Sequence, residues 1–198
     1  MTSEHGAEAA LAAAAMTLRP NLKVLIGGSF GVALISALFL PWPLALASTT
    51  LGAFMLAGAD IDARTFLLPD LMTAGALLSG LVAAATFDPV SAWFGVATAT
   101  ARAAGTALVL GGVRAGYARL RGREGLGLGD IKLAAALGAW LPLEAIPLCF
   151  ALATAAALIT VLLATLRGQR IERTTRVPLG AFLCPAVWLT YFGSALVG

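Results

Sequence analysis

Seven apolar segments follow one another along this chain, and they restrict its possible folds more than any other feature of the sequence. The segments are Leu22–Leu40, Leu44–Ala59, Leu71–Phe87, Ala92–Val113, Ile131–Leu141, Pro147–Leu166 and Val177–Val197. Of the 198 residues, 60% are apolar and only 12% are charged, and the mean hydropathy is +0.91. Soluble domains have roughly 45–50% apolar and about 25% charged residues, and the excess here would leave large apolar patches in water. The composition therefore excludes an ordinary cytosolic domain, a disordered chain and a nucleic-acid-binding module.

The segments favour helices over the strands of a β-barrel. A helix needs roughly 20 apolar residues to cross a ~30 Å hydrocarbon core, whereas barrel strands alternate apolar and polar residues. These segments are continuous and rich in Ala and Leu, and their small residues allow close helix packing in a bilayer. The sequence predicts an all-α, polytopic transmembrane bundle of about seven spans over residues 22–198. Residues 1–21, which lack the order of a signal peptide, are expected to form a cytosolic N-terminal tail.

The positive charges predict the orientation of this bundle. Twelve of the 13 Lys and Arg residues lie at alternate segment ends, and the opposite connections contain none. Basic residues concentrate on the cytoplasmic side of membrane proteins, so the N-terminus is expected inside and the C-terminus outside. The twelve are Arg19, Lys23, Arg64, Arg114, Arg119, Arg121, Arg123, Lys132, Arg167, Arg170, Arg173 and Arg176.

Two features depart from this simple pattern. Arg102 falls inside the fourth segment, where it can extend toward the membrane surface or pair with a buried acid. The fifth segment has only eleven residues, which reach ~16 Å at about 1.5 Å each. We expect its helix to begin below the cytoplasmic surface, which would recess Asp130 at its start into a partly dry site.

Several kinds of chemistry are not expected. The only histidine, His5, lies in the N-terminal tail, which argues against a Ser-His-Asp triad, a Cys-His pair and a histidine-rich zinc site. Cys149 and Cys184 lie in apolar segments and are predicted to be small buried side chains. We expect no metal and no cofactor.

Two polar segments, residues 59–70 and 122–132, interrupt the apolar pattern on the same predicted side of the membrane. Asp62 and Asp130 are 68 residues apart, yet helix packing can bring them together. Two carboxyl groups in a low-dielectric site share a proton, so one can activate a water while the other protonates a peptide carbonyl. The pair therefore predicts amide hydrolysis. Because Asp130 begins a helix, we expect it to ionise more readily, with the proton on Asp62.

The other residues of these segments have competing interpretations. Gly125, Gly127 and Gly129 can form a flexible strand beside Asp130 that suits an extended substrate; a phosphate-binding loop would need a Gly-Lys-Ser/Thr ending. Asp60 and Asp70 fit structural or helix-capping roles, and Lys132 fits either a topological charge or a contact to substrate or carboxylate.

These segments resemble the prepilin peptidase family, the type IV leader peptidases, which are membrane aspartic proteases of the Gly-x-Gly-Asp type. The first similarity is Asp62 followed eight residues later by the last residue of Leu68-Pro69-Asp70. The second is Gly127-Leu128-Gly129-Asp130-Ile131-Lys132, and the third is Val177-Pro178-Leu179-Gly180-Ala181-Phe182, in which Leu179 and Ala181 depart from the family pattern. The similarity covers roughly residues 44–197.

The resemblance implies an aspartic endopeptidase of the bacterial inner membrane with Asp62 and Asp130 as the catalytic pair. It implies removal of a short basic leader from prepilins or pseudopilins of type IV pilus and type II secretion systems, at the cytoplasmic face. Residues expected to bind substrate or to support the site are Gly127, Gly129, Lys132, Arg64, Pro69 and Asp70.

One departure separates this chain from longer family members. They resemble each other in a cytosolic domain with two Cys-x-x-Cys pairs that hold zinc, and they also N-methylate the new amino terminus. This chain has neither pair, so we expect peptidase activity without methyltransferase activity. Two other classes stay open from the residues alone: an ion-coupled transporter that uses intramembrane carboxylates, and a non-catalytic membrane scaffold.

Overall fold

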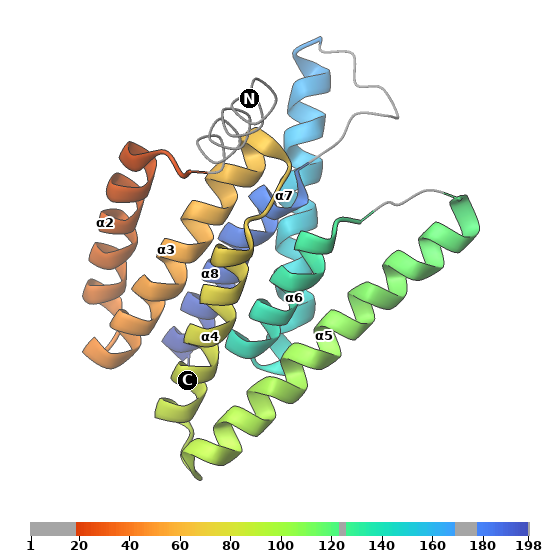
Figure 1. Ribbon diagram of the computed structural model, residues 1–198. Coiled ribbons are helices and arrows are strands. Elements are labelled where there is room, and N and C mark those ends of the chain that lie inside the picture. The colour runs from red at the N-terminus through yellow and green to blue at the C-terminus, as the bar shows by residue number, and fades with distance from the viewer. Residues whose placement is uncertain (1–18, 123–125, 169–177, 198) are drawn as a thin grey trace, which may run out of the picture.

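The computed structural model describes residues 19–122, 126–168 and 178–197. In these ranges the chain forms seven α-helices and one short 3-10 helix, η1, with no strand (Figure 1). The helices are α2 (Leu22–Phe39), α3 (Trp42–Thr65), α4 (Asp70–Phe87), α5 (Ala92–Arg121), α6 (Leu128–Trp140), η1 (Leu143–Ala145), α7 (Ile146–Leu166) and α8 (Leu179–Val197). The predicted all-α class is confirmed. Most of the N-terminal tail, with His5, lies outside the described residues. So do Gly125 and four of the basic residues, Arg123, Arg170, Arg173 and Arg176.

Six helices of the described chain are long and apolar enough to cross a membrane, and α6 is the exception. Its 13 residues reach about 20 Å, well short of a ~30 Å hydrocarbon core. The count of about seven spans therefore stays a prediction for α6. Its sides are largely covered by other helices, since it packs against α4, α5 and α8.

Successive helices run in opposite directions, so alternate helix ends gather at each end of the bundle (Figure 1). The C-terminal end of α3 and the N-terminal ends of α4, α6 and α8 lie together at one end. Both polar segments identified in the sequence are therefore at the same end of the molecule. The inside and outside assignment of the two ends stays a prediction.

Local residue chemistry sets several helix boundaries near this end. Phe66 adopts a left-handed conformation (φ 56°) directly after α3, and its N–H bonds the carbonyl of Asp62 at 2.9 Å. This is a common way to end a helix, although glycine is the usual residue. Pro69 caps α4, and Gly122 ends α5 in a left-handed conformation (φ 65°). The connection between α3 and α4 is therefore short and closely defined.

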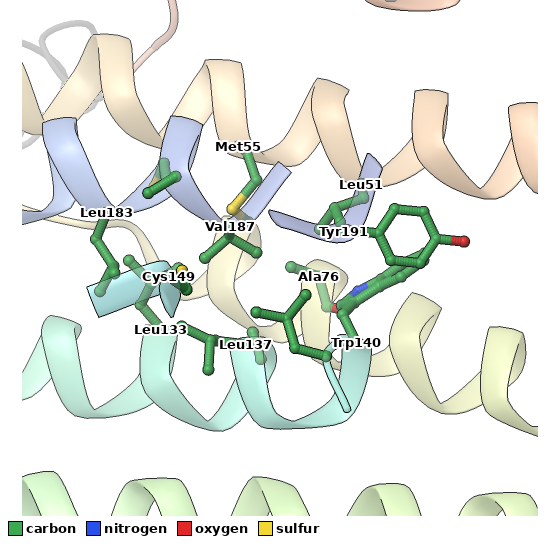
Figure 2. Packing of buried hydrophobic residues seen from close by; sticks show 14 of the residues in the cluster. Leu51, Met55, Ala76, Leu133, Leu137, Trp140, Cys149, Leu183, Val187 and Tyr191 are labelled. Atoms are coloured by element: carbon green, nitrogen blue, oxygen red, sulfur yellow. The ribbon is translucent and has the colours of Figure 1, made fainter. Parts of the chain in front are cut away.

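The core of the bundle is built around α6. Leu133 and Leu137 are fully buried and pack toward Met55 of α3 and Val187 of α8 (Figure 2). Trp140 donates a hydrogen bond from its indole nitrogen to the carbonyl of Ala76 at 2.7 Å. Many large apolar side chains at the perimeter are exposed instead, which suits a surface that faces lipid.

Arg102 has a partner that sequence reasoning did not consider. Its Nε donates to the carbonyl of Gly138 at 3.2 Å, and Thr106 Oγ1 donates to the carbonyl of Ala134 at 2.7 Å. Gly138 lies in the last turn of α6, where carbonyl groups lack in-helix donors and a positive charge is favourable. Arg102 therefore joins α5 to the end of α6 through a backbone carbonyl, rather than through a buried acid.

Candidate active site

Asp62 lies in the last turn of α3, where it is only 6% exposed. Its Oδ2 accepts a hydrogen bond from the N–H of Ala181 at 2.8 Å, in the first turn of α8. The neighbouring residue is Gly180, and a Cβ at that position would lie 2.8 Å from Oδ2 of Asp62. The start of α8 can approach Asp62 this closely because residue 180 has no side chain.

Asp130 lies in the first turn of α6 and is partly buried. Its Oδ2 accepts a hydrogen bond from the N–H of Gly127 at 3.1 Å, and Gly127 is the residue that caps the helix. An acidic residue in this position satisfies a free donor at the helix start and is favoured by the helix dipole. The position of the Asp130 carboxyl group is therefore set within three residues of sequence.

The two carboxyl groups are close enough to influence each other. Burial raises the pKa of Asp130, the N–H of Gly127 opposes this rise, and the negative charge of Asp62 adds to it. Each carboxyl group accepts a hydrogen bond from a backbone N–H at a different helix start. The described bundle thus places Asp62 and Asp130 within electrostatic range of each other, with Asp62 buried and Asp130 partly buried.

The geometry removes the reason for predicting that Asp130 ionises before Asp62. We expected Asp130 to ionise more readily because it begins a helix. Asp62 also faces a helix start, since the amide at the beginning of α8 donates to it. Both carboxyl groups receive this stabilisation, so the location of the shared proton stays a prediction without that support.

Five of the six predicted supporting residues lie at the starts of α4 and α6. Gly127 caps the helix, and a Cβ at Gly129 would lie 3.1 Å from Cβ of Leu68 in the connection between α3 and α4. Pro69 caps α4. Lys132 Nζ forms an ion pair with Oδ1 of Asp70 at 2.5 Å, which joins the start of α4 to α6.

Arg64 takes part in a separate network. It forms an ion pair with Oδ2 of Asp60 at 2.6 Å, and it donates to the carbonyl of Arg19 at 2.9 Å. The N–H of Asn21 donates to the same Asp60 oxygen at 2.7 Å. These contacts join the start of α2 to α3, and none of them involves Asp62 or Asp130. The geometry gives Asp60 the structural role that its sequence position suggested.

Sequence reasoning missed three neighbours of the acids: Gly180, Ala181 and Cys184. The signal for the first two was present, because the stretch from Val177 to Phe182 was part of the resemblance, but no role followed from it. Cys184 is a fully buried, free thiol in electrostatic range of both Asp62 and Asp130. In the described ranges no group of three or more His, Cys, Asp or Glu side chains is arranged to hold a metal.

Comparison with known proteins identifies the family. A sequence profile of the type IV leader peptidase family matches residues 49–162, which include both acids. The chain belongs to the type IV leader peptidase family. The family membership does not support the transporter alternative. No solved structure matched the chain.

Several relatives in this family carry the name prepilin leader peptidase/N-methyltransferase. The protein from Burkholderia pseudomallei (strain 1026b) is 39% identical over 159 residues, 79% of this chain and 49% of the relative. The protein from Dickeya chrysanthemi is 40% identical over 179 residues, 88% of this chain and 57% of the relative. The protein from Aeromonas salmonicida (strain A449) is 32% identical over 177 residues, 89% of this chain and 58% of the relative. This chain thus spans about half the length of the curated relatives it matches.

Proposed function

We propose that this protein is a membrane aspartic endopeptidase that removes the short basic leader from prepilins or pseudopilins, with Asp62 and Asp130 as its catalytic residues. The observation that carries the proposal is that these two acids lie at the same end of an apolar helical bundle, within electrostatic range of each other. Each is held by a backbone N–H at a helix start, and the charge of Asp62 acts on Asp130. The names of the relatives support the substrate class.

The chemistry follows from a pair of acids that shares one proton. The ionised carboxylate takes a proton from a water molecule, and the water oxygen attacks the scissile carbonyl carbon. The protonated carboxyl group gives its proton to the carbonyl oxygen, which forms a tetrahedral intermediate. When the intermediate collapses, one of its hydroxyl groups returns a proton to the carboxylate that had given one, the C–N bond breaks, and the proton taken from the water passes to the leaving amine. No covalent enzyme intermediate is needed.

The glycine segment before Asp130 supports a place for the substrate backbone. Gly127 is exposed, and the atoms nearest to a Cβ built at Gly129 belong to Leu68, in the connection between α3 and α4. We place the extended leader of the substrate along this segment, where the scissile bond would face both acids. Backbone without side chains lets a second strand approach closely.

The charge distribution supports a cytoplasmic site in the bacterial inner membrane. Arg64 and Lys132 lie at the end of the bundle that carries both acids. The start of α2 and the end of α5 lie at the same end, and both contribute further basic residues. Basic residues favour the cytoplasmic side. We assign the peptidase to residues 22–198. The proposal covers leader removal; mass spectrometry of the new amino terminus will reveal any N-methylation.

The deciding experiment is cleavage of a co-expressed prepilin by the wild type, Asp62→Asn and Asp130→Asn. Both variants keep the size of the side chain but cannot ionise, so each should lose leader removal while membrane levels stay normal. Asp60→Asn is the matched control, because Asp60 lies on the same helix and bonds Arg64 instead. Normal cleavage by either active-site variant would refute the mechanism.

A further inference from the structure

Leu68 contacts both helices that carry the acids. A Cβ at Gly58 of α3 would lie 3.3 Å from Cδ1 of Leu68. A Cβ at Gly129 of α6 would lie 3.1 Å from Cβ of Leu68 and 3.7 Å from its carbonyl oxygen. The backbone of α3 therefore lies near the tip of the Leu68 side chain and that of α6 lies near its base, at positions where neither helix has a side chain.

These two contacts lie next to the acids. Gly58 precedes Asp62 by four residues, one turn earlier on the same face of α3. Gly129 directly precedes Asp130 in the first turn of α6. Leu68 thus lies between α3 and α6 within one helical turn of each carboxyl-bearing residue.

The chain on both sides of Leu68 is held in place. Before it, Phe66 is fixed in a left-handed conformation by a hydrogen bond to the carbonyl of Asp62. After it, Pro69 caps α4, and the Asp70–Lys132 ion pair ties the start of α4 to α6. Leu68 itself packs against the buried core. A side chain anchored in this way can act as a fixed spacer.

We propose that Leu68 is a positioning residue that sets the separation of Asp62 and Asp130 by keeping α3 and α6 apart. This inference rests on the proposed peptidase function. The side chain does not touch the reacting atoms; it acts through the backbones of Gly58 and Gly129. A shorter side chain would let the helices shift and would misplace one acid relative to the other, while the surface that binds substrate would change little.

The first test compares Leu68→Ala with Leu77→Ala. Leu77, in α4, is also partly buried and packed against the core, so the two variants remove the same atoms from similar surroundings. Both should lower the melting temperature in detergent by similar amounts. Because displacement of a catalytic group by ~1 Å can cost about 100-fold, Leu68→Ala should lower kcat for prepilin cleavage by about 10- to 100-fold with KM within about 3-fold. Leu77→Ala should keep kcat within about 3-fold.

Conservative variants keep the test usable if Leu68→Ala does not fold. Leu68→Met has nearly the same volume and should keep kcat within about 3-fold. Leu68→Val removes one carbon and should fall between Met and Ala. A kcat that follows the length of this side chain supports the spacer. Equal losses at positions 68 and 77, or full activity of Leu68→Ala, would overturn it.

A second-site test uses the glycine on α3. Gly58→Ala adds a methyl group 3.3 Å from Cδ1 of Leu68 and 3.2 Å from Sγ of Cys184. As a single substitution it should therefore lower kcat. In Gly58→Ala/Leu68→Ala the new methyl group occupies space that Leu68 vacates. The double variant should be at least about 3-fold more active than the product of the two single effects, since residues in contact are non-additive. Strictly multiplied effects would contradict a shared spacing role.

The wild type and Asp62→Asn separate this inference from the function on which it rests. If the wild type does not cleave prepilin, or if Asp62→Asn does, the proposed function is wrong. If the wild type cleaves, Asp62→Asn is inactive and the Leu68 variants behave like the Leu77 control, the function stands and only the spacer is wrong.

Discussion

Asp62 and Asp130 occupy the same end of the bundle but are held by different kinds of contact. The donor to Asp62 is Ala181, 119 residues away in sequence, whereas the donor to Asp130 is Gly127, three residues away. The first contact exists only when α8 is packed against α3; the second forms with the first turn of α6. The geometry of Asp62 therefore depends on the tertiary fold, and that of Asp130 is largely local.

The largest effect should come from Gly180→Ala, which targets the long-range contact. A Cβ at position 180 would lie 2.8 Å from Oδ2 and 2.9 Å from Cγ of Asp62, so α8 or the carboxyl group must move. We expect cleavage of prepilin, measured as kcat, to fall by about 100-fold or more. Gly193→Ala is the control, because a Cβ there meets nothing within 4 Å and α8 continues through it. Equal activity of both variants would mean that α8 does not position Asp62.

A smaller effect is expected from removing the local donor to Asp130. Gly127 has φ −72°, which proline can adopt, and Gly127→Pro deletes the N–H that bonds Asp130. That N–H lowers the pKa of Asp130, so its loss should raise this pKa further. The limb of the pH–rate profile that reports Asp130, acidic if Asp130 is the base and basic if it is the acid, should move to higher pH, and kcat should fall by about 10-fold.

Gly127→Ala sharpens the same point because it keeps the N–H. Its added Cβ would lie 3.2 Å from Oδ2 of Asp130, which calls for only a small adjustment. Its kcat should lie between those of wild type and Gly127→Pro, with the limb that reports Asp130 nearly unmoved. If both limbs of the pH–rate profile stay in place in the proline variant, this hydrogen bond does not control the ionisation of Asp130.

The smallest effect should come from Lys132→Met, which breaks the ion pair with Asp70. Both side chains are well exposed, at 49% and 77%, and exposed pairs contribute about 0–1 kcal/mol. We expect kcat/KM to change by less than about 3-fold and the melting temperature to change little. A loss in kcat/KM beyond about 10-fold, without a loss of stability, would indicate instead that Lys132 contacts the substrate.

Hydropathy predicted the helices well because a chain in a bilayer must satisfy its backbone hydrogen bonds internally. It placed their ends less well wherever polar residues continue a helix. The second segment was expected to end at Ala59, but α3 continues to Thr65 and includes Asp62. The fourth was expected to end at Val113, but α5 continues through an arginine-rich end to Arg121.

The candidate site was predictable in part, because charged residues are conspicuous beside long apolar segments. Asp62 and Asp130 stood out as acids beside apolar segments, and Gly127 and Gly129 were close to Asp130 in sequence. The roles of Gly180, Ala181 and Leu68 were not predictable, because each depends on which helices become neighbours. A single sequence does not show which helices become neighbours, and Ala181 and Asp62 are 119 residues apart.

The hydrogen bonds from α5 to the carbonyl groups of α6 have a consequence for how the protein enters a membrane. A helix of 13 residues with an acid in its first turn is a poor candidate for insertion alone, and an arginine in the middle of α5 is costly there too. Together they compensate, since Arg102 and Thr106 supply donors to α6. We expect the membrane-insertion machinery to release α5 and α6 into lipid as one hairpin. The first effect of a mutation of Arg102 would then be defective membrane insertion during synthesis.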